Sequence, residues 1–195
     1  MTNWFRVAVA ASAFAMASAL PAAAVKFDTL TVEQDMALGT YEAVYIAPVE
    51  VALDPNTRRN LRDIRTDRPV SETDQARNAR EFQEDLVRVF GKHFELAEAP
   101  GDGVLTIDAT ITRLVSTRPS QADFQRFVGI DFSSIYAGGA SFTVELKEGD
   151  APLATIIERE QTFLNDGRPR VGVWQDTDYV FSRFSRKLSR YARGK

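Results

Sequence analysis

Two segments of the chain, residues 104–116 and 140–147, alternate apolar and polar side chains along their length. A period of two is the pattern of a β-strand with one buried face and one wet face. The turn Glu148-Gly149-Asp150 then leads into a third segment, residues 153–163, so that the last two segments form an antiparallel hairpin. These segments predict an antiparallel sheet that buries one face and exposes the other.

Two amphipathic helices are expected beside the strands. From about Glu72 to Lys92, apolar residues recur at spacings of three and four, behind Ser71 and Asp74 in the arrangement of a capping box. A second helix is expected to begin near Asp176 or Thr177 and to continue toward the C-terminus. Both helices have an apolar side that can cover the buried face of the sheet.

The remaining segments complete the expected fold. Residues 25–40 show no clear period and are interpreted as an irregular lead-in, whereas residues 41–51 are rich in β-branched and aromatic side chains and predict a strand. Pro48 lacks an N–H group, so it marks the end of that strand, an edge or a bulge. Residues 41–195 therefore predict one α+β domain. We expect a two-layer sandwich in which two amphipathic helices cover one face of a mostly antiparallel sheet of about four or five strands.

The first 24 residues have the pattern of a cleaved signal peptide. Arg6 is the only charged residue among the first 25, and an apolar run from Val7 to Leu20 leads to the small residues Ala22-Ala23-Ala24. The run is shorter than the roughly 20 residues that a membrane-spanning helix needs. The alternative, a buried N-terminal helix, is disfavoured because the run is apolar all round. We therefore expect export to the periplasm or to the periphery of the envelope, with no transmembrane segment in the mature chain.

Sequence stretches in the expected strands resemble a known family. VYIAPVEV, GDGVLTIDATITRLVS and GGASFTVEL occur in that order, and a tryptophan, Trp174, precedes the last helix. From Tyr41 to Tyr191 the chain resembles the bacterial envelope family catalogued as domain of unknown function 3313. Many members of that family are lipoproteins, but Ala24 stands here where they carry a lipidated cysteine, so we expect no lipid anchor. The resemblance implies no catalytic residues.

Composition excludes several kinds of chemistry. The formal net charge is −3 and the pI is about 5.3, so nucleic acid is not an expected partner, because phosphate binding needs a basic surface. The chain has no cysteine and a single histidine, His93, and we therefore expect no disulfide, no metal site and no cofactor. His93 lies where the first helix should end, which suits the helix dipole without a catalytic role.

The leading hypothesis for function is a non-enzymatic binding or accessory module for envelope assembly or transport. Its partner would be an envelope protein or a glycolipid. The alternative is a periplasmic hydrolase that acts through a pair of carboxylates, since glycoside hydrolysis requires only two suitably spaced acids. Asp108 stands out among the acids because it lies in mid-strand on the wetter face, where a solvated or cross-strand hydrogen-bonded position is the simpler interpretation.

Three stretches are candidate contact surfaces. Residues 54–69 carry five arginines, suited to phosphate or carboxylate groups, but interleaved aspartates favour a self-paired loop. The connection 119–138 is long and apolar, so it either folds over the core or presents a patch to a partner. Its candidate lid or partner residues are Phe124, Phe127, Phe132 and Tyr136.

The last helix is the third candidate. All acidic residues precede Tyr179, and six basic residues follow it. These cations compensate the helix dipole in one interpretation, and in the other they contact an anionic membrane surface. The basic residues expected on one side of the helix are Arg183, Arg186, Lys187 and Arg190. Trp174 is expected to act as a hydrophobic staple or a core plug, with stacking on a ligand as the alternative.

Overall fold

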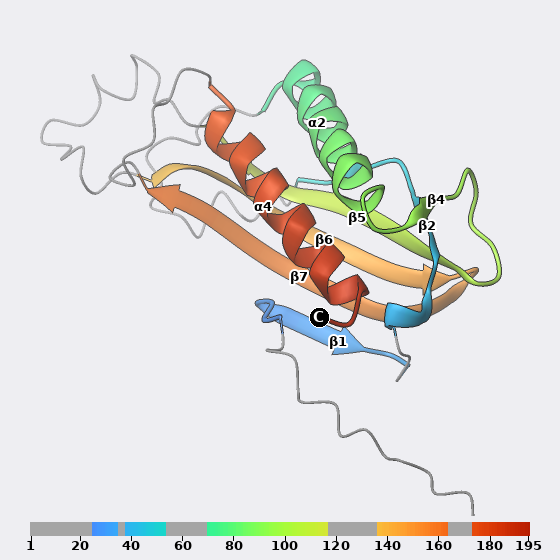
Figure 1. Ribbon diagram of the computed structural model, residues 1–195. Coiled ribbons are helices and arrows are strands. Elements are labelled where there is room, and N and C mark those ends of the chain that lie inside the picture. Colours follow the sequence, from blue (N-terminus) through green and yellow to red (C-terminus); the bar gives the residue numbers. More distant parts are fainter. Residues whose placement is uncertain (1–24, 35–37, 54–69, 117–135, 164–172) are drawn as a thin grey trace, which may run out of the picture.

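The computed structural model describes residues 25–34, 38–53, 70–116, 136–163 and 173–195. It has two layers, a seven-stranded sheet and two helices that both cover the same face of that sheet (Figure 1). The helices are α2 (Glu72–Phe90) and α4 (Gln175–Ala192), and a short 3-10 turn, η1, spans Leu38–Thr40. The strands are β1 (Thr29–Val32), β2 (Ala43–Ile46), β3 (Glu50–Val51), β4 (Glu95–Leu96), β5 (Val104–Val115), β6 (Tyr136–Glu148) and β7 (Ala151–Phe163).

The sheet is mixed and larger than the sequence predicts. Its strand order is β1-β7-β6-β5-β2-β4, with β3 also paired to β5. β1, β7, β6 and β5 are antiparallel neighbours, whereas β2 and β3 run parallel to β5, and β4 runs parallel to β2. The α+β class and the two helices are confirmed, but the mostly antiparallel sheet of four or five strands is wrong. The reason is that α2 carries the chain from the end of β3 back to the start of β5, which makes these strands parallel.

The segment 25–40 is not irregular throughout, contrary to the expectation from its sequence. Residues 29–32 form β1, which pairs with β7 from Thr29↔Ile157 to Val32↔Ala154 and makes the outer strand of the sheet. All four β1 side chains are exposed. Leu30 and Val32 alternate with Thr29 and Thr31 over these four residues only, and both apolar side chains are exposed, so the short pattern did not lead to the prediction of a strand.

Local signals in the rest of the chain match the structure closely. The predicted strand 41–51 is interrupted around Pro48, with β2 before it and β3 after it. Ser71 caps α2, since its Oγ accepts a hydrogen bond from the Asp74 backbone N at 3.1 Å. The turn between β6 and β7 contains Gly149 at φ +56°, in the left-handed region that glycine adopts readily.

Four phenylalanines form the centre of the core, between the helices and the sheet. The ring of Phe142, from β6, stacks on that of Phe184 in α4, with centroids 4.5 Å apart. The ring of Phe82, from α2, stacks on that of Phe181 at 5.0 Å. None of the four has measurable exposure. Their burial joins both helices to the central strand and gives the helix termini fixed positions relative to the sheet.

Candidate functional site

Three long connections of the chain attach at one end of the sandwich. β3 and β5 end there because they are parallel, and β6 begins and β7 ends there because each is antiparallel to its neighbour. Both helices also begin at this end (Figure 1). Residues 54–69, 117–135 and 164–172 therefore all join elements at this end, which we call the loop-bearing end. Binding residues are often carried on loops that a rigid scaffold positions.

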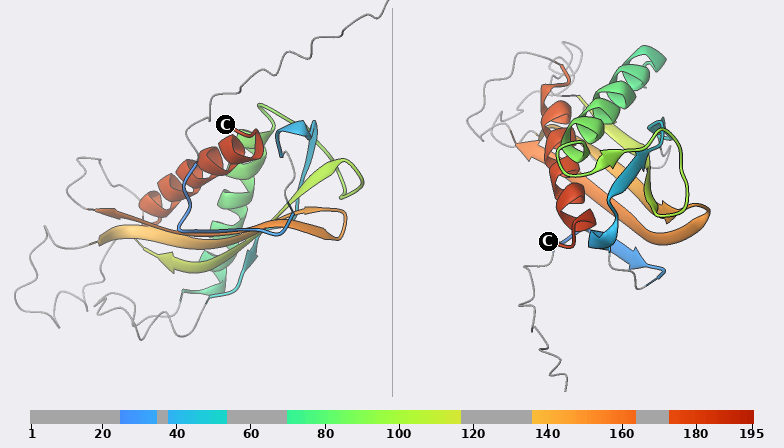
Figure 2. Two further views of the ribbon diagram at one scale, coloured as in Figure 1. Left: turned by 90° about the horizontal axis from the view of Figure 1, so that it is seen from below. Right: turned by 45° about the vertical axis from the view of Figure 1, so that its right-hand side comes forward.

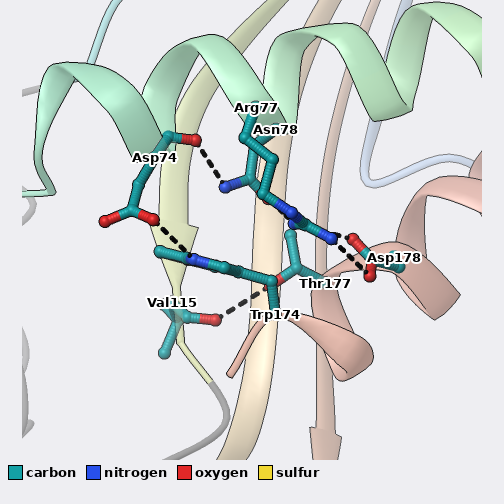
Figure 3. A network of polar contacts seen from close by, with 7 residues as sticks. All are labelled: Asp74, Arg77, Asn78, Val115, Trp174, Thr177 and Asp178. Carbon is teal, nitrogen blue, oxygen red and sulfur yellow. Dashed lines mark hydrogen bonds and ion pairs between the residues drawn. The ribbon is translucent and has the colours of Figure 1, made fainter. Parts of the chain in front are cut away.

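A hydrogen-bond network holds the helix N-termini together at the loop-bearing end (Figure 3). Trp174, at the N-cap position of α4, donates from Nε1 to Oδ1 of Asp74 in the first turn of α2, at 3.0 Å. The other carboxylate oxygen of Asp74 accepts from Ser71 Oγ at 2.7 Å. Asn78 is fully buried and donates from Nδ2 to the Asp74 carbonyl at 2.7 Å. Trp174 itself is only 9% exposed, which fits the core-plug interpretation.

Two further contacts complete this network. Arg77 of α2 makes a bidentate ion pair with Asp178 of α4, with N–O distances of 3.2 and 2.9 Å. The hydrogen bond to Asp178 raises the pKa of Arg77. The buried Thr177 hydroxyl donates to the carbonyl of Val115, at the end of β5, at 3.0 Å. The starts of both helices and the end of β5 are thus tied directly to one another, as a rigid base for the three connections.

Most of the loop residues predicted from the sequence lie outside the described part of the chain. Phe124, Phe127 and Phe132 lie outside the described residues, as do the five arginines of residues 54–69. Tyr136 is the first residue of β6, and its side chain is also outside the described part. The predictions made for these residues therefore stay predictions.

The basic residues of α4 divide into two kinds. Arg183 Nε lies 2.8 Å from Glu160 Oε2, and Lys187 Nζ forms an ion pair with Glu158, both carboxylates coming from β7. The two glutamate side chains are only 3% and 6% exposed. Arg186 and Arg190 are exposed and have no ion pair in the part of the chain that the structure describes. The predicted contact of the basic helix face with an anionic surface stays a prediction, and it rests on fewer free cations than the sequence indicated.

The two buried glutamates of β7 were not predicted as site residues from the sequence. Strand alternation places them on the helix side of β7, in line with Ala154 and Ile156. Burial raises the pKa of Glu160, and the positive charge of Arg183 opposes this shift. The signal was present in the sequence, because acids two and four residues beyond a buried isoleucine in a strand point to the same face.

Asp108 and His93 have the structural surroundings that the simpler interpretations predict. Asp108 Oδ2 accepts from Lys147 Nζ of the neighbouring β6 at 2.8 Å, a cross-strand ion pair. His93 is exposed just after α2, and partial desolvation together with Arg193, Lys195 and Lys92 lowers its pKa. Among the described residues, no three or more histidine or acidic side chains gather as they would around a metal ion.

Within the same described part of the chain, no helix combines the length and the apolar character needed to cross a membrane. No curated protein sequence matches the chain.

Solved structures with a similar fold share little sequence with it. A dodecamer of a PelC variant from Paraburkholderia phytofirmans has 10% identity and a TM-score of 0.41, over 83% of this chain and 96% of that one. Protein XCC0632 from Xanthomonas campestris has 11% identity and a TM-score of 0.48, over 85% and 93% of the two chains. A putative neuraminyllactose-binding hemagglutinin homolog from Helicobacter pylori has 8% identity and a TM-score of 0.38, over 80% and 82%.

The sequence itself matches a family model along most of its length. The matched residues, 23–188, include every helix and strand of the two-layer fold except the last residues of α4. The chain belongs to the family of proteins of unknown function DUF3313.

Proposed function

We propose that this protein is a non-enzymatic binding module of the cell envelope and that it receives its partner at the loop-bearing end. One observation carries the proposal: three long connections attach where both helices begin, on a base fixed by the contacts of Trp174, Arg77 and Thr177. A rigid base lowers the entropy that binding would otherwise lose in ordering the contact surface.

The sequences of these connections indicate the chemistry of the partner. Residues 54–69 supply five guanidinium groups, and residues 117–135 supply several aromatic and aliphatic side chains. Guanidinium groups pair with phosphates and carboxylates, and aromatic side chains contribute most to the energy of protein interfaces. An envelope protein or glycolipid that combines anionic and apolar groups suits this composition. The signal-peptide pattern of residues 1–24 supports an envelope location, and Ala24 supports a chain without a lipid anchor.

A carboxylate-based hydrolase gains no support from the buried acidic pair of the described residues. Glu158 and Glu160 are close in β7, but each is paired with a cation of α4 and covered by that helix. A catalytic acid needs access to a substrate, and these two side chains have almost none.

Site-specific photocross-linking in intact cells tests the proposal. A photoreactive residue replaces Val173, which is 46% exposed at the loop-bearing end, or, as the control, the exposed Asp150 in the β6–β7 turn at the other end. We expect position 173 to give a discrete cross-linked species that position 150 does not. The same product from both positions would contradict the proposal.

A screen of hydrolase and glycan-cleaving activities completes the test. Turnover that a single carboxylate substitution abolishes would show an enzyme and refute the binding-module proposal.

A further inference from the structure

Both helices end together at the opposite end of the sandwich, and basic residues gather there. α2 ends at Phe90 and is followed by Lys92 and His93, while α4 ends at Ala192 and is followed by Arg193 and Lys195. The two helices pack against each other over the same face of the sheet and run from the loop-bearing end toward this one (Figure 1 and Figure 2). We call the group of Lys92, His93, Arg193 and Lys195 the basic end. These residues come from two helices about a hundred positions apart in the chain.

The backbone holds these cations in place. After α4, Gly194 adopts φ +67°, its N donates to the Tyr191 carbonyl at 2.9 Å, and Lys195 N donates to the Arg190 carbonyl at 3.0 Å. This pair of bonds is a Schellman motif, which turns the chain back at the helix end. After α2, His93 N donates to the Phe90 carbonyl at 2.9 Å. The basic end is therefore a fixed surface and not a trailing charged tail.

None of the four basic side chains forms an ion pair with an aspartate or glutamate within the described ranges. Arg183 and Lys187, about three and two turns before Arg193 in α4, are paired with glutamates. The Arg193 side chain donates from Nε to the Ser189 carbonyl, and Lys92 and Lys195 are exposed. Beside desolvation, the positive charges of Arg193, Lys195 and Lys92 lower the pKa of His93, so each of the three cations acts on this imidazole. A cluster of like charges on the surface attracts an anionic partner.

Two exposed apolar side chains lie next to this cluster. Val87 is 39% exposed and Leu96 is 41% exposed. They flank Gly91: a Cβ atom on that glycine would lie 3.0 Å from the Val87 carbonyl oxygen and 3.1 Å from Leu96 Cδ1. Leu96 pairs with the buried Val44, so its side chain is on the helix side of the sheet. Cations beside exposed apolar side chains suit a surface that combines anionic headgroups with hydrocarbon.

Compensation of the helix dipoles explains only part of this arrangement. A cation near a helix C-terminus is favourable, and each helix has one close to its last turn. Dipole compensation does not require the cations of two helices to gather at one place, and it does not account for Val87 and Leu96. A surface of anionic headgroups above hydrocarbon accounts both for the gathered cations and for the exposed apolar side chains.

We propose that the basic end binds an anionic lipid surface, with Lys92, Arg193 and Lys195 at the headgroups and Leu96 and Val87 against the upper acyl region. α2 has 19 residues and is about 28 Å long, which separates this contact from the loop-bearing end. The protein bound in this way holds its loop-bearing end away from the membrane, where a partner can reach it.

Vesicle co-sedimentation of the protein as cells produce it tests the inference. The vesicles contain three parts phosphatidylcholine to one part phosphatidylglycerol, and vesicles of phosphatidylcholine alone measure any contribution that needs no charge. The test variant carries Lys92→Gln, Arg193→Gln and Lys195→Gln. The matched control carries Lys26→Gln, Arg80→Gln and Arg159→Gln, which remove the same charge from exposed positions outside the basic end. The melting temperature of each variant verifies that it is folded.

We expect the partition coefficient of the test variant to fall about 100-fold, since each cation near an anionic surface contributes a factor of about five. The control should change it by less than about fivefold, and Leu96→Ser should cause a several-fold loss without a change in charge. Equal losses in both triple variants would show attraction by net charge alone and overturn the proposal. Failure of the wild type to bind, or equal binding to neutral vesicles, would overturn it as well. The result is independent of the cross-linking at Val173, so either proposal can fail alone.

Discussion

The bond between Trp174 and Asp74 should contribute measurably to stability. Trp174→Phe keeps an aromatic ring in the pocket but removes the Nε1 donor, which lies 3.0 Å from Asp74 Oδ1. A hydrogen bond to a charged group contributes about 1.5–3 kcal/mol. We take the lower part of that range because the carboxylate keeps its bond from Ser71 and some access to water. With the loss of ring volume, we expect Trp174→Phe to lower the free energy of unfolding by about 2 kcal/mol. Trp174→Ala should lower it by about 3–5 kcal/mol, because it also leaves a cavity.

Urea unfolding followed by far-ultraviolet circular dichroism measures these effects. Val173→Ala, one residue earlier and 46% exposed, is the control and should change stability by less than about 0.5 kcal/mol. A double-mutant cycle of Trp174→Phe with Asp74→Ala isolates the pair from the other contacts of Asp74. We expect a coupling energy of about 1 kcal/mol or more. A coupling energy within about 0.3 kcal/mol of zero would refute the conclusion that this bond joins the two helix N-termini.

Three further changes test the sheet and the core. Because burial raises the pKa of Glu160, the folded state binds a proton more tightly than the unfolded state, and the resulting stability is lost as the pH rises above the ordinary value of 4.5. Glu160→Gln should flatten this decline above the ordinary pKa of 4.5 in urea titrations. Gly139→Ala should cost about 1–3 kcal/mol, since its Cβ would lie 2.3 Å from the Glu160 carbonyl oxygen, whereas Gly101→Ala, with no atom within 4 Å, should be neutral. Phe142→Ala should cost about 3–5 kcal/mol in the same assay, and a loss below about 1 kcal/mol would contradict its central place in the core.

Elements with a strong local signal were predictable from the sequence. β5 spans Val104–Val115, within one residue of the predicted strand, because its alternation reports a buried face directly. α2 begins at Glu72 behind its Ser71 cap, as predicted, since capping depends on residues three positions apart.

Features that depend on distant parts of the chain were not predictable. β1 has no buried side chain of its own, so only its pairing with β7 makes it a strand. The parallel pairing of β2 and β5 follows from the path of the chain through α2, and the sequence pattern of each strand is compatible with either direction. The sequence indicated burial for Trp174, but its partner Asp74 lies 100 residues away and no local pattern connects them.

The basic residues of the last helix show most clearly that the charge pattern of one segment does not reveal the partners that other segments supply. Sequence periodicity placed four cations on one side of α4, but β7 supplies buried glutamates to Arg183 and Lys187. Among the described residues, further cations without an acidic partner follow the helix, at Arg193 and Lys195, and these two and Lys92, which follows α2, all act on His93. Both helices begin at the loop-bearing end and cover the same face of the sheet. Both therefore end at the opposite end of the sandwich, where the basic residues that follow them lie. The same arrangement separates the two proposed contacts, and binding at one end therefore leaves the other end accessible.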